Sequence, residues 1–249
     1  MDALSIKVKS VLNLLTGLVT QMETNAQESR IVAVIPCYNE QATIGRVVLG
    51  ALRSATDVIV INDGSMDRTE EEAKRAGALV ISHPKNRGKG AALKTAFEYL
   101  KQMQFKAAVV MDGDGQHDPA EITRLVEPII KGDADMVIGS RYLEGADKIP
   151  FYRKIGQRVL NFVTYQVSKV RVSDSQSGYR SFSYRAVKEM ELKEKGFSVE
   201  SEMQIIAGRK DLKVVEIPIS TIYNGKAKRN PFAHGFNVLF RVLLLAGRD

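Results

Sequence analysis

From Arg30 onward the chain alternates short, continuously apolar runs with longer amphipathic stretches, and this alternation limits the fold more than any other feature. Apolar runs of about four to eight residues, bounded by Gly, Pro, Asn or Asp, are typical of strands buried on both faces. We predict strands over 31–36, 57–63, 78–82, 107–114 and 135–140. We predict helices over 40–52, 67–77, 88–103 and 119–132. Repeated β–α units of this kind predict an α/β fold of the Rossmann-like type, with a mostly parallel sheet flanked by helices.

The composition is that of an ordinary globular protein of 249 residues, 44% of them apolar and 26% charged. The single cysteine, Cys37, excludes an internal disulfide and indicates a reducing compartment, so we do not expect a secreted protein. Only three histidines are present, which argues against a His-rich zinc site. The oxygen-bearing side chains of residues 112–116, DGDGQ, instead suit Mg²⁺ or Mn²⁺.

The net charge of +7 is concentrated in two segments. Residues 148–171 contain six Lys or Arg and residues 217–248 contain five, and neither segment contains Asp or Glu. The remainder of the chain is therefore mildly acidic. This arrangement indicates a phosphate-bearing partner or an anionic membrane surface, and it argues against a nucleic-acid partner.

Residues 148–171, KIPFYRKIGQRVLNFVTYQVSKVR, combine their cations with aromatic and aliphatic side chains. That composition is typical of a helix that lies in a membrane interface, and we predict an amphipathic membrane-interface segment here. The alternative is a core helix with a solvated basic face. The longest apolar runs in the chain have about ten residues, about half of what a transmembrane helix needs, so we expect peripheral attachment.

Both ends of the chain lie outside the repeated β–α units, which leaves 30–222 as the main domain. Over 1–29 we predict an amphipathic helix and a polar linker, and the helix contacts either lipid or a second copy of the chain in a homo-oligomer. Over 223–249 we predict a basic flexible loop, which includes Lys228, followed by an amphipathic helix. The loop is either a flap that closes cations over a phosphate or a solvated run of charge.

Three aspartates follow predicted strands, at the edge where ligands bind in sheets of this type. Asp63 follows VIVIN, and Asp112 and Asp114 follow AVVM. If these strands are neighbours, the three carboxylates converge on one crevice. Like charges that close require compensation, and a divalent metal that bridges a diphosphate is the simplest form of it. The alternative, in which aspartates only favour turns and cap helices, fits Asp118 before Pro119.

Residues 86–93, NRGKGAAL, lack the spacing of a P-loop. Gly88 and Gly90 permit a tight entry into the following helix, with backbone amides and Lys89 facing the site. We place Lys89 with the nucleotide-sugar-binding residues, and a purely structural role of this loop is the alternative. Residues 174–183, DSQSGYRSFS, are turn-rich and open a second polar cluster after the basic segment, and the alternative is an ordinary surface loop.

Seven motifs follow one another in a fixed order: IPCYNE, VINDGS.D.T, N.GKG.A, MDGDGQHDP, GSRY, SGYRSF and IPISTIY. This ordered set, from about Arg30 to Pro231, resembles inverting family-2 glycosyltransferases, and within them the polyprenyl-phosphate sugar transferases of the dolichol-phosphate mannose synthase group. The resemblance implies a GT-A fold that binds a nucleotide-sugar donor and Mg²⁺ or Mn²⁺. It also implies transfer of the sugar to a polyprenyl or dolichyl phosphate acceptor, for glycan or protein glycosylation, at the cytoplasmic face of a membrane.

The resemblance also implies roles for individual residues. The residues implied to hold the nucleotide-sugar are Pro36, Tyr38, Glu40, Asp63, Asp112 and Asp114. Asp114 and Gln116 match the metal-coordinating pair of the family. The cations that match those contacting phosphate are Arg141, Arg153 and, in the closing loop, Lys228. We therefore predict Asp112, Asp114 and Arg141 as the catalytic residues.

Two features depart from the family pattern. Ala227 stands where the family loop often has serine, and Asn224 and Gly225 lie where an arginine often stands. The C-terminal transmembrane helices that members of this group often have are not found in this sequence.

A phosphate acceptor is already ionised near neutral pH, so sugar transfer to it needs no strong general base. It needs a neutralised diphosphate leaving group and an aligned acceptor. Three alternatives remain: a family-2 transferase acting on a glycan or protein hydroxyl, which requires a base; a sugar-nucleotide-binding or nucleotidyl-transfer protein; and a non-catalytic membrane scaffold. GDP-mannose, UDP-glucose and UDP-N-acetylglucosamine fit the sequence equally well as donors.

Overall fold

The computed structural model describes residues 30–144, 151–194, 196, 198–220, 222 and 241, although not the side chains of residues 151–153. The helix predicted over 1–29 lies outside the described residues. So do the loop and helix predicted over 223–249, apart from Arg241. The predicted membrane-interface segment is described from Phe151 onward.

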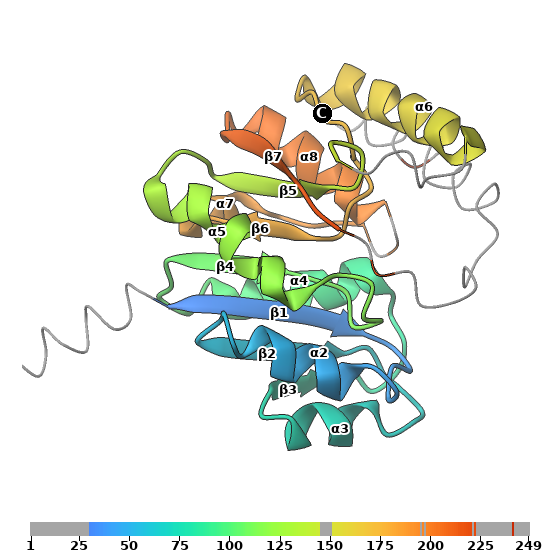
Figure 1. Cartoon of the computed structure of the whole chain (residues 1–249), viewed down its shortest axis with the longest axis vertical. Coiled ribbons are helices and arrows are strands. Elements are labelled where there is room, and N and C mark those ends of the chain that lie inside the picture. The colour runs from blue at the N-terminus through green and yellow to red at the C-terminus, as the bar shows by residue number, and fades with distance from the viewer. Residues whose placement is uncertain are drawn as a thin grey trace, which may run out of the picture.

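A seven-stranded sheet forms the centre of the described part of the molecule, in the order β3–β2–β1–β4–β6–β5–β7 (Figure 1). Its strands are β1 (Ile31–Cys37), β2 (Asp57–Asn62), β3 (Leu79–Ser82), β4 (Ala107–Val110), β5 (Met136–Ser140), β6 (Arg180–Phe182) and β7 (Val214–Pro218). All neighbours pair in parallel except β6, which is antiparallel to both β4 and β5. The predicted α/β fold with a mostly parallel sheet is therefore confirmed.

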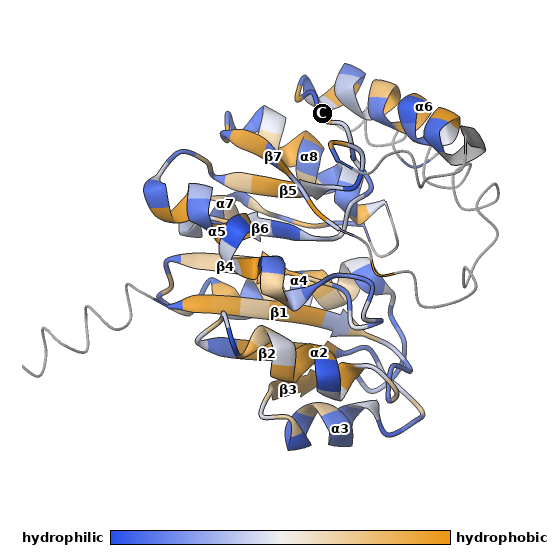
Figure 2. Ribbon diagram, viewed as in Figure 1, coloured by the Kyte–Doolittle hydropathy of each residue, from blue (hydrophilic) through white to orange (hydrophobic). Residues whose placement is uncertain are grey.

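Helices cover both faces of this sheet, and two apolar cores result. The helices are α2 (Ile44–Ala51), α3 (Thr69–Arg75), α4 (Lys89–Leu100), α5 (Ile122–Lys131), α6 (Phe151–Ser168), α7 (Tyr184–Glu189) and α8 (Val199–Arg209). Successive strand residues point to opposite faces, so Val32 and Val34 pack with α4, α7 and α8, whereas Ala33 and Ile35 pack with α2, α3 and α5. Figure 2 shows the strands as largely hydrophobic ribbons between these layers.

The five predicted strands and four predicted helices are all present, with shifted ends. The helix predicted from residue 40 begins at Ile44, because the Glu40 carbonyl first accepts hydrogen bonds from the backbone N–H groups of Thr43 and Ile44 in a turn. The strand predicted to residue 114 ends at Val110, so the acidic residues lie in the turn that follows β4.

The surface-loop alternative for 174–183 was wrong in its last part, which forms β6. Three residues that include an arginine and a serine show no strand pattern in the sequence. Arg180 is nevertheless only 1% exposed, since its guanidinium donates to the carbonyl oxygens of Ser175, Ser177 and Glu200, each at 2.8 Å. Those bonds replace the lost hydration of the charge, and burial lowers the pKa of Arg180 to about 10.

Helix α6 lies beside α8 at the outside of the fold (Figure 1). Gln157 and Thr164 are buried on its inner face, whereas Ile155, Val159 and Phe162 are 48%, 47% and 61% exposed. Each buried residue lies two positions after an exposed one, as in Ile155 and Gln157 or Phe162 and Thr164. Two positions correspond to about 200° around a helix, so the buried and the exposed residues lie on opposite faces. None of the helices in the described ranges is long and apolar enough to cross a membrane.

Candidate active site

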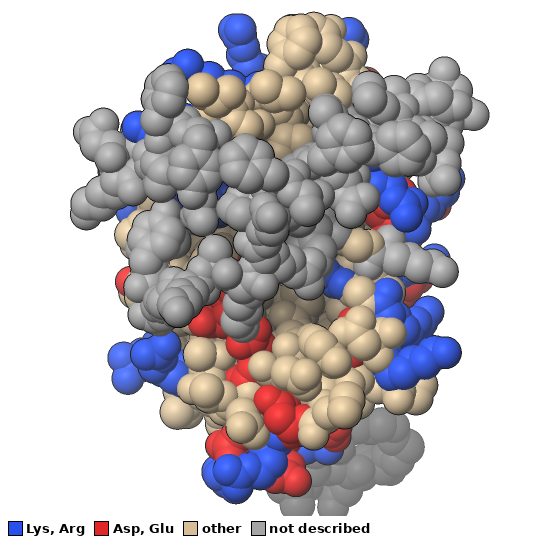
Figure 3. Space-filling view, turned by 90° about the vertical axis from the view of Figure 1, so that its right-hand side faces the viewer, with Lys and Arg blue, Asp and Glu red and all other residues tan. Residues whose placement is uncertain are grey.

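The polar residues singled out from the sequence lie at the carboxyl edge of the sheet. Asp63 directly follows β2, Asp112 and Asp114 lie just beyond β4, and Arg141 directly follows β5. β2 and β4 are not neighbours, but both pair with β1, so their ends share one edge. Figure 3 looks onto the side of the molecule to which these ends point and shows acidic side chains gathered along the middle of that face. This edge of the sheet is where ligands bind in parallel α/β folds.

Asp112 belongs to an ion-pair network that the sequence alone did not reveal. Lys89, the first residue of α4, places its Nζ 2.6 Å from Asp112 Oδ1 and 2.8 Å from Glu200 Oε1 on α8. Burial alone would raise the pKa of Asp112, but the charges of Lys89, His117 and Arg141 hold it below its ordinary value. Burial alone would lower the pKa of Lys89, and its two carboxylate partners raise it instead. The ammonium therefore stays charged between two carboxylates.

Gly178 lies directly over this network. A Cβ at this position would come within 2.8 Å of Lys89 Nζ and 3.0 Å of Asp112 Oδ2. The second carboxylate oxygen of Glu200, Oε2, is buried and has no hydrogen-bond partner in the described part of the chain. The glycine thus permits the ion pairs to lie against the loop before β6.

Asp114 has different surroundings from Asp112. Its Oδ1 accepts from the Gln116 backbone N–H at 3.0 Å, and its Oδ2 accepts from Gln116 Nε2 at 2.8 Å. Burial and then the negative charge of Asp112 raise the pKa of Asp114. Its ionised form is therefore short of positive charge, which a bound cation would supply.

The donor set at Asp114 and Gln116 fits a hard divalent cation. A carboxylate and an amide that can present its oxygen, together with substrate oxygens, are ligands that Mg²⁺ and Mn²⁺ accept. Within the described ranges no group of three or more His, Cys, Asp or Glu side chains has the geometry of a metal site.

The acidic turn is held in place by residues on both of its sides. The Asp112 backbone N–H donates to His117 Nδ1 at 3.1 Å, and burial lowers the pKa of His117. The His117 ring stacks on Tyr179, with 4.7 Å between centroids, and the Tyr179 hydroxyl donates to the Asp118 carbonyl at 2.8 Å. Gly115 has a φ of 75°, which favours glycine at the tip of the turn.

Asp63, the third of the carboxylates expected to converge, has its own partners within the protein. His83 Nδ1 lies 2.7 Å from Asp63 Oδ1, and the backbone N–H groups of Arg87 and Gly88 donate to the Asp63 carboxylate at 2.9 and 2.7 Å. Hydrogen-bond donors of the protein thus compensate this charge. Asp63 holds the loop that leads into α4 and so determines where Lys89 begins that helix.

Arg141 pairs with a buried carboxylate behind the site. Its Nε and Nη2 donate to the two oxygens of Asp174 at 2.7 and 2.8 Å, while Asp174 itself is 0% exposed. The Arg141 side chain is 31% exposed and its charge contributes to lowering the pKa of Asp112, so the guanidinium acts on the same site as the acidic turn.

The remaining predicted site residues fall into two groups. Pro36 lies within β1, Tyr38 is 41% exposed just beyond it, and Glu40 accepts from the Thr43 hydroxyl at 3.3 Å. The side chain of Arg153 and all of Lys228 lie outside the described residues.

Sequence reasoning missed Glu200 and Asp174 as members of the site. Asp174 lies in the motif segment that ends in SGYRSF, and Glu200 lies in FSVESEM, which carried no prediction. An acidic residue at the start of an apolar helix is an ordinary capping pattern, so nothing in the local sequence distinguished Glu200.

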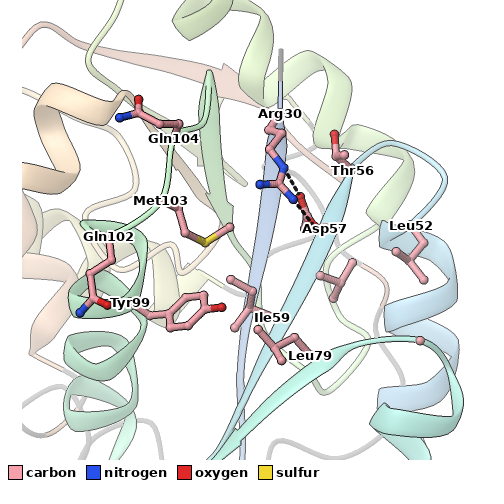
Figure 4. Close-up of a pocket in the computed structure, with 12 residues that line it drawn as sticks. Arg30, Leu52, Thr56, Asp57, Ile59, Leu79, Tyr99, Gln102, Met103 and Gln104 are labelled. Carbon is pink, nitrogen blue, oxygen red and sulfur yellow. Dashed lines mark hydrogen bonds and ion pairs between the residues drawn. The ribbon is translucent and has the colours of Figure 1, made fainter. Parts of the chain in front are cut away.

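A separate pocket lies at the opposite edge of the sheet (Figure 4). It is lined at the amino ends of β1, β2 and β3 by residues that include Arg30, Asp57 and Leu79, together with Tyr99 and Met103 from the α4 region. The Arg30–Asp57 ion pair crosses it at 3.1 Å. Because none of the acidic-turn residues lines this pocket, the active site is assigned to the carboxyl edge.

Comparison with known proteins places this site in a family. A family model described as Glycosyl transferase family 2 matches residues 32–191. The UDP-N-acetylglucosamine–dolichyl-phosphate N-acetylglucosaminyltransferase of Methanococcus voltae is 34% identical to the chain over 239 residues, covering 86% of this chain and 95% of that relative. The dolichol-phosphate mannosyltransferase of Pyrococcus furiosus is 32% identical over 203 residues, covering 77% of this chain and 56% of that relative.

A solved structure supports the same fold. The glucosyl-3-phosphoglycerate synthase of Mycobacterium tuberculosis, in complex with Mn²⁺, UDP and phosphoglyceric acid, matches with a TM-score of 0.70 and 20% identity. The match covers 89% of this chain and 80% of that chain, and it confirms the predicted GT-A fold. With a matching family model over most of the described sheet and relatives of this similarity, the chain belongs to glycosyl transferase family 2 and is a glycosyltransferase.

Proposed function

We propose that this glycosyltransferase moves a sugar, with inversion, from a nucleotide-sugar to a polyprenyl or dolichyl phosphate. The observation that carries the proposal is the outward apolar row of α6, Ile155, Val159 and Phe162, on a helix that is hydrogen-bonded to the loop whose carboxylate pairs with Arg141. A lipid acceptor requires such a surface beside the site, whereas a soluble acceptor does not. The relatives from Methanococcus voltae and Pyrococcus furiosus, whose names refer to dolichyl or dolichol phosphate, agree with this choice of acceptor.

The proposed membrane contact also rests on cations in the middle of α6 and just beyond its C-terminal end. Arg158, Lys169 and Arg171 are exposed at or near the apolar row, and Arg171 lies 6.0 Å from the ring centroid of Tyr165. Cations around an exposed apolar row suit a helix that lies flat in an anionic interface. We therefore infer peripheral attachment through α6, and we place it on the cytoplasmic face of the membrane.

On the donor side, we assign the nucleoside to Pro36, Tyr38, Glu40 and Asp63 at the ends of β1 and β2. We assign Mg²⁺ or Mn²⁺ to Asp114 and Gln116, where it would neutralise the diphosphate of the donor. Lys89 and Asp112 support this arrangement, since their ion pair keeps an ammonium and a carboxylate fixed beside the acidic turn.

On the acceptor side, we assign the lipid phosphate to Arg141, joined by Arg153 and Lys228. An oxygen of the acceptor phosphate attacks the anomeric carbon of the sugar, and the bond from that carbon to the donor diphosphate breaks. The electron pair leaves with the nucleoside diphosphate, and the carbon is inverted. No proton has to be removed from the acceptor, so the site needs alignment and positive charge and does not need a strong base.

Transfer of radiolabelled sugar tests the proposal directly. GDP-mannose, UDP-glucose and UDP-N-acetylglucosamine are each incubated with the enzyme and polyprenyl phosphate vesicles, with Mn²⁺, with Mg²⁺ or with EDTA. We expect label in an organic-soluble product that mild acid releases, from one donor, and lost with EDTA or in Asp114→Asn. Label that appears only in a glycan or a protein would refute the lipid acceptor and favour a hydroxyl acceptor.

Vesicle flotation tests the membrane contact separately. Phe162→Asp should reduce co-flotation with anionic vesicles severalfold, because the substitution places a charge in the apolar row. Leu49→Asp is the matched control, since Leu49 is 57% exposed on α2. Equal loss in both variants, or no loss in Phe162→Asp, would show that α6 is not the contact.

A further inference from the structure

We propose that Asp174 and Asn161 are positioning residues that orient Arg141 toward the acceptor phosphate, so that α6 and the site are connected through one loop. This inference rests on the proposed function, in which Arg141 binds that phosphate. The loop concerned, Val172 to Ser175, is part of the connection between α6 and β6.

The first part of the connection is the set of hydrogen bonds between Arg141 and Asp174. Three N–H groups of Arg141 donate to this one carboxylate: its backbone N at 3.2 Å, Nε at 2.7 Å and Nη2 at 2.8 Å. A guanidinium has five N–H donors in a rigid plane, so holding the donors on one edge also determines the direction of the remaining donors. Asp174 is fully buried, and a buried carboxylate is retained only where its bonds compensate the loss of hydration.

The second part is the way the loop itself is held on both sides. From β7, the carboxylate of Glu216 accepts from the Ser173 backbone N–H at 2.8 Å and from the Asp174 backbone N–H at 3.2 Å. From α6, Asn161 Nδ2 donates to the Ser173 carbonyl at 2.7 Å, and Asn161 Oδ1 accepts from the Ser175 backbone N–H at 3.0 Å. One amide thus binds the residues on both sides of Asp174.

The third part is the orientation of the helix. Gln157 donates to Asn161 Oδ1 at 2.8 Å, so the two amides form one row along the inner face of α6. The apolar row proposed for lipid contact lies on the opposite face, and Phe162 directly follows Asn161 in the sequence. The helix that faces the lipid therefore also holds the loop that orients Arg141, and Asn161 links the position of the phosphate-binding arginine to that of the lipid-facing helix.

Binding of a short, water-soluble acceptor analogue tests this inference without turnover. Geranyl phosphate is titrated calorimetrically into the wild type, Asn161→Ala, Asp174→Asn, Asp174→Glu and the control Gln166→Ala, whose amide is exposed on the same helix. In parallel, the affinity for a nucleoside diphosphate with Mn²⁺ is measured. We expect affinity for geranyl phosphate to fall about tenfold in Asp174→Asn and severalfold in Asn161→Ala. Nucleoside diphosphate affinity and Gln166→Ala should stay within about twofold of the wild type.

The outcomes separate this inference from the proposed function. Unchanged geranyl phosphate affinity in Asn161→Ala and Asp174→Asn would overturn the positioning role, even if the wild type transfers sugar to lipid. Weakened affinity in both variants would support it, even if the wild type transfers no sugar to lipid. If the wild type did not bind geranyl phosphate, the inference would be overturned as well, because Arg141 would then not bind the acceptor phosphate. Asp174→Glu keeps the carboxylate, so a partial recovery of geranyl phosphate affinity in this variant distinguishes a positioning role from a general loss of folding. Retained nucleoside diphosphate binding shows that Asn161→Ala is folded.

Discussion

Replacing Lys89 by methionine removes the ammonium that bridges Asp112 and Glu200 while it keeps most of the side-chain volume. The side chains of Lys89 and Glu200 are 12% and 6% exposed, so neither carboxylate can recover full hydration where it stands. Asp112, at 31% exposed, is better solvated. Two negative charges would therefore remain close together without their shared cation.

The size of the effect follows from these exposures. Removing one partner of a buried ion pair costs about 3–5 kcal/mol, and the partial exposure of Asp112 argues for the lower end, about 3 kcal/mol. For a chain of this size, 1 kcal/mol corresponds to about 2–4 °C, so the melting temperature should fall by about 6–12 °C. Lys94→Met is the control, because Lys94 is exposed on the same helix, and we expect it to change stability by no more than about 0.5 kcal/mol.

The dependence on pH gives the substitution a signature that packing loss would not produce. In the wild type the pKa of Asp112 is lowered, so its ionised form stabilises the fold above its ordinary pKa, and this contribution is lost as pH falls through the lowered value. Without Lys89, burial becomes the dominant influence and raises the pKa of Asp112. The free energy of unfolding of Lys89→Met, relative to that of the wild type, should therefore rise as pH falls from 7 to about 5.

Denaturant unfolding at several pH values, followed by circular dichroism, measures both quantities. The double variant Lys89→Met/Glu200→Gln should recover part of the lost stability, because one of the two facing charges is gone. The reasoning would be refuted if Lys89→Met matched Lys94→Met in stability at pH 7, or if the double variant were less stable than Lys89→Met alone at every pH.

Two further predictions concern the same edge of the sheet. Burial and the Asp112 charge raise the pKa of Asp114, so as pH falls its protonation should weaken Mn²⁺ binding at a higher pH than protonation of an ordinary aspartate would. Calorimetry with a nucleoside diphosphate between pH 7 and 5 measures this, and an Mn²⁺ affinity that stays constant over the range would contradict it. Gly178→Ala should cost about 1–3 kcal/mol of stability, since the new Cβ would press on Lys89 and Asp112. Gly156→Ala is the control and should not destabilise, because no atom lies within 4 Å of a Cβ at that position. Thermal melts that show equal effects of the two substitutions would contradict the steric argument.

Some of the active site was predictable because its signals are local. The run AVVM followed by DGDGQ predicts a strand end with carboxylates, and the structure places Asp112 and Asp114 just beyond β4. The amphipathic composition of residues 148–171 is also a local signal, although only the structure shows that Ile155, Val159 and Phe162 are the apolar side chains that face outward. In both cases the signal lies within one short segment.

Other parts could not be predicted because they depend on contacts far apart in the sequence. The pairing of Arg141 with Asp174 and of Lys89 with Glu200 joins segments 33 and 111 residues apart. Asp63 shows the same limit: the sequence marks it as a strand-end carboxylate, and only the fold shows that backbone N–H groups already compensate it.

The sequence by itself determined the repeated β–α units, the edge of the sheet that carries the acidic residues and the amphipathic character of α6. These properties come from the order of apolar and polar residues along short segments. Only the tertiary structure decided that β6 enters the sheet antiparallel between β4 and β5, which brings Gly178 against Lys89 and Asp112 from the first half of the chain. The reason is physical: a three-residue strand with a charged side chain has no preference strong enough to show locally, and it is stable only because both neighbouring strands and three carbonyl groups bind it.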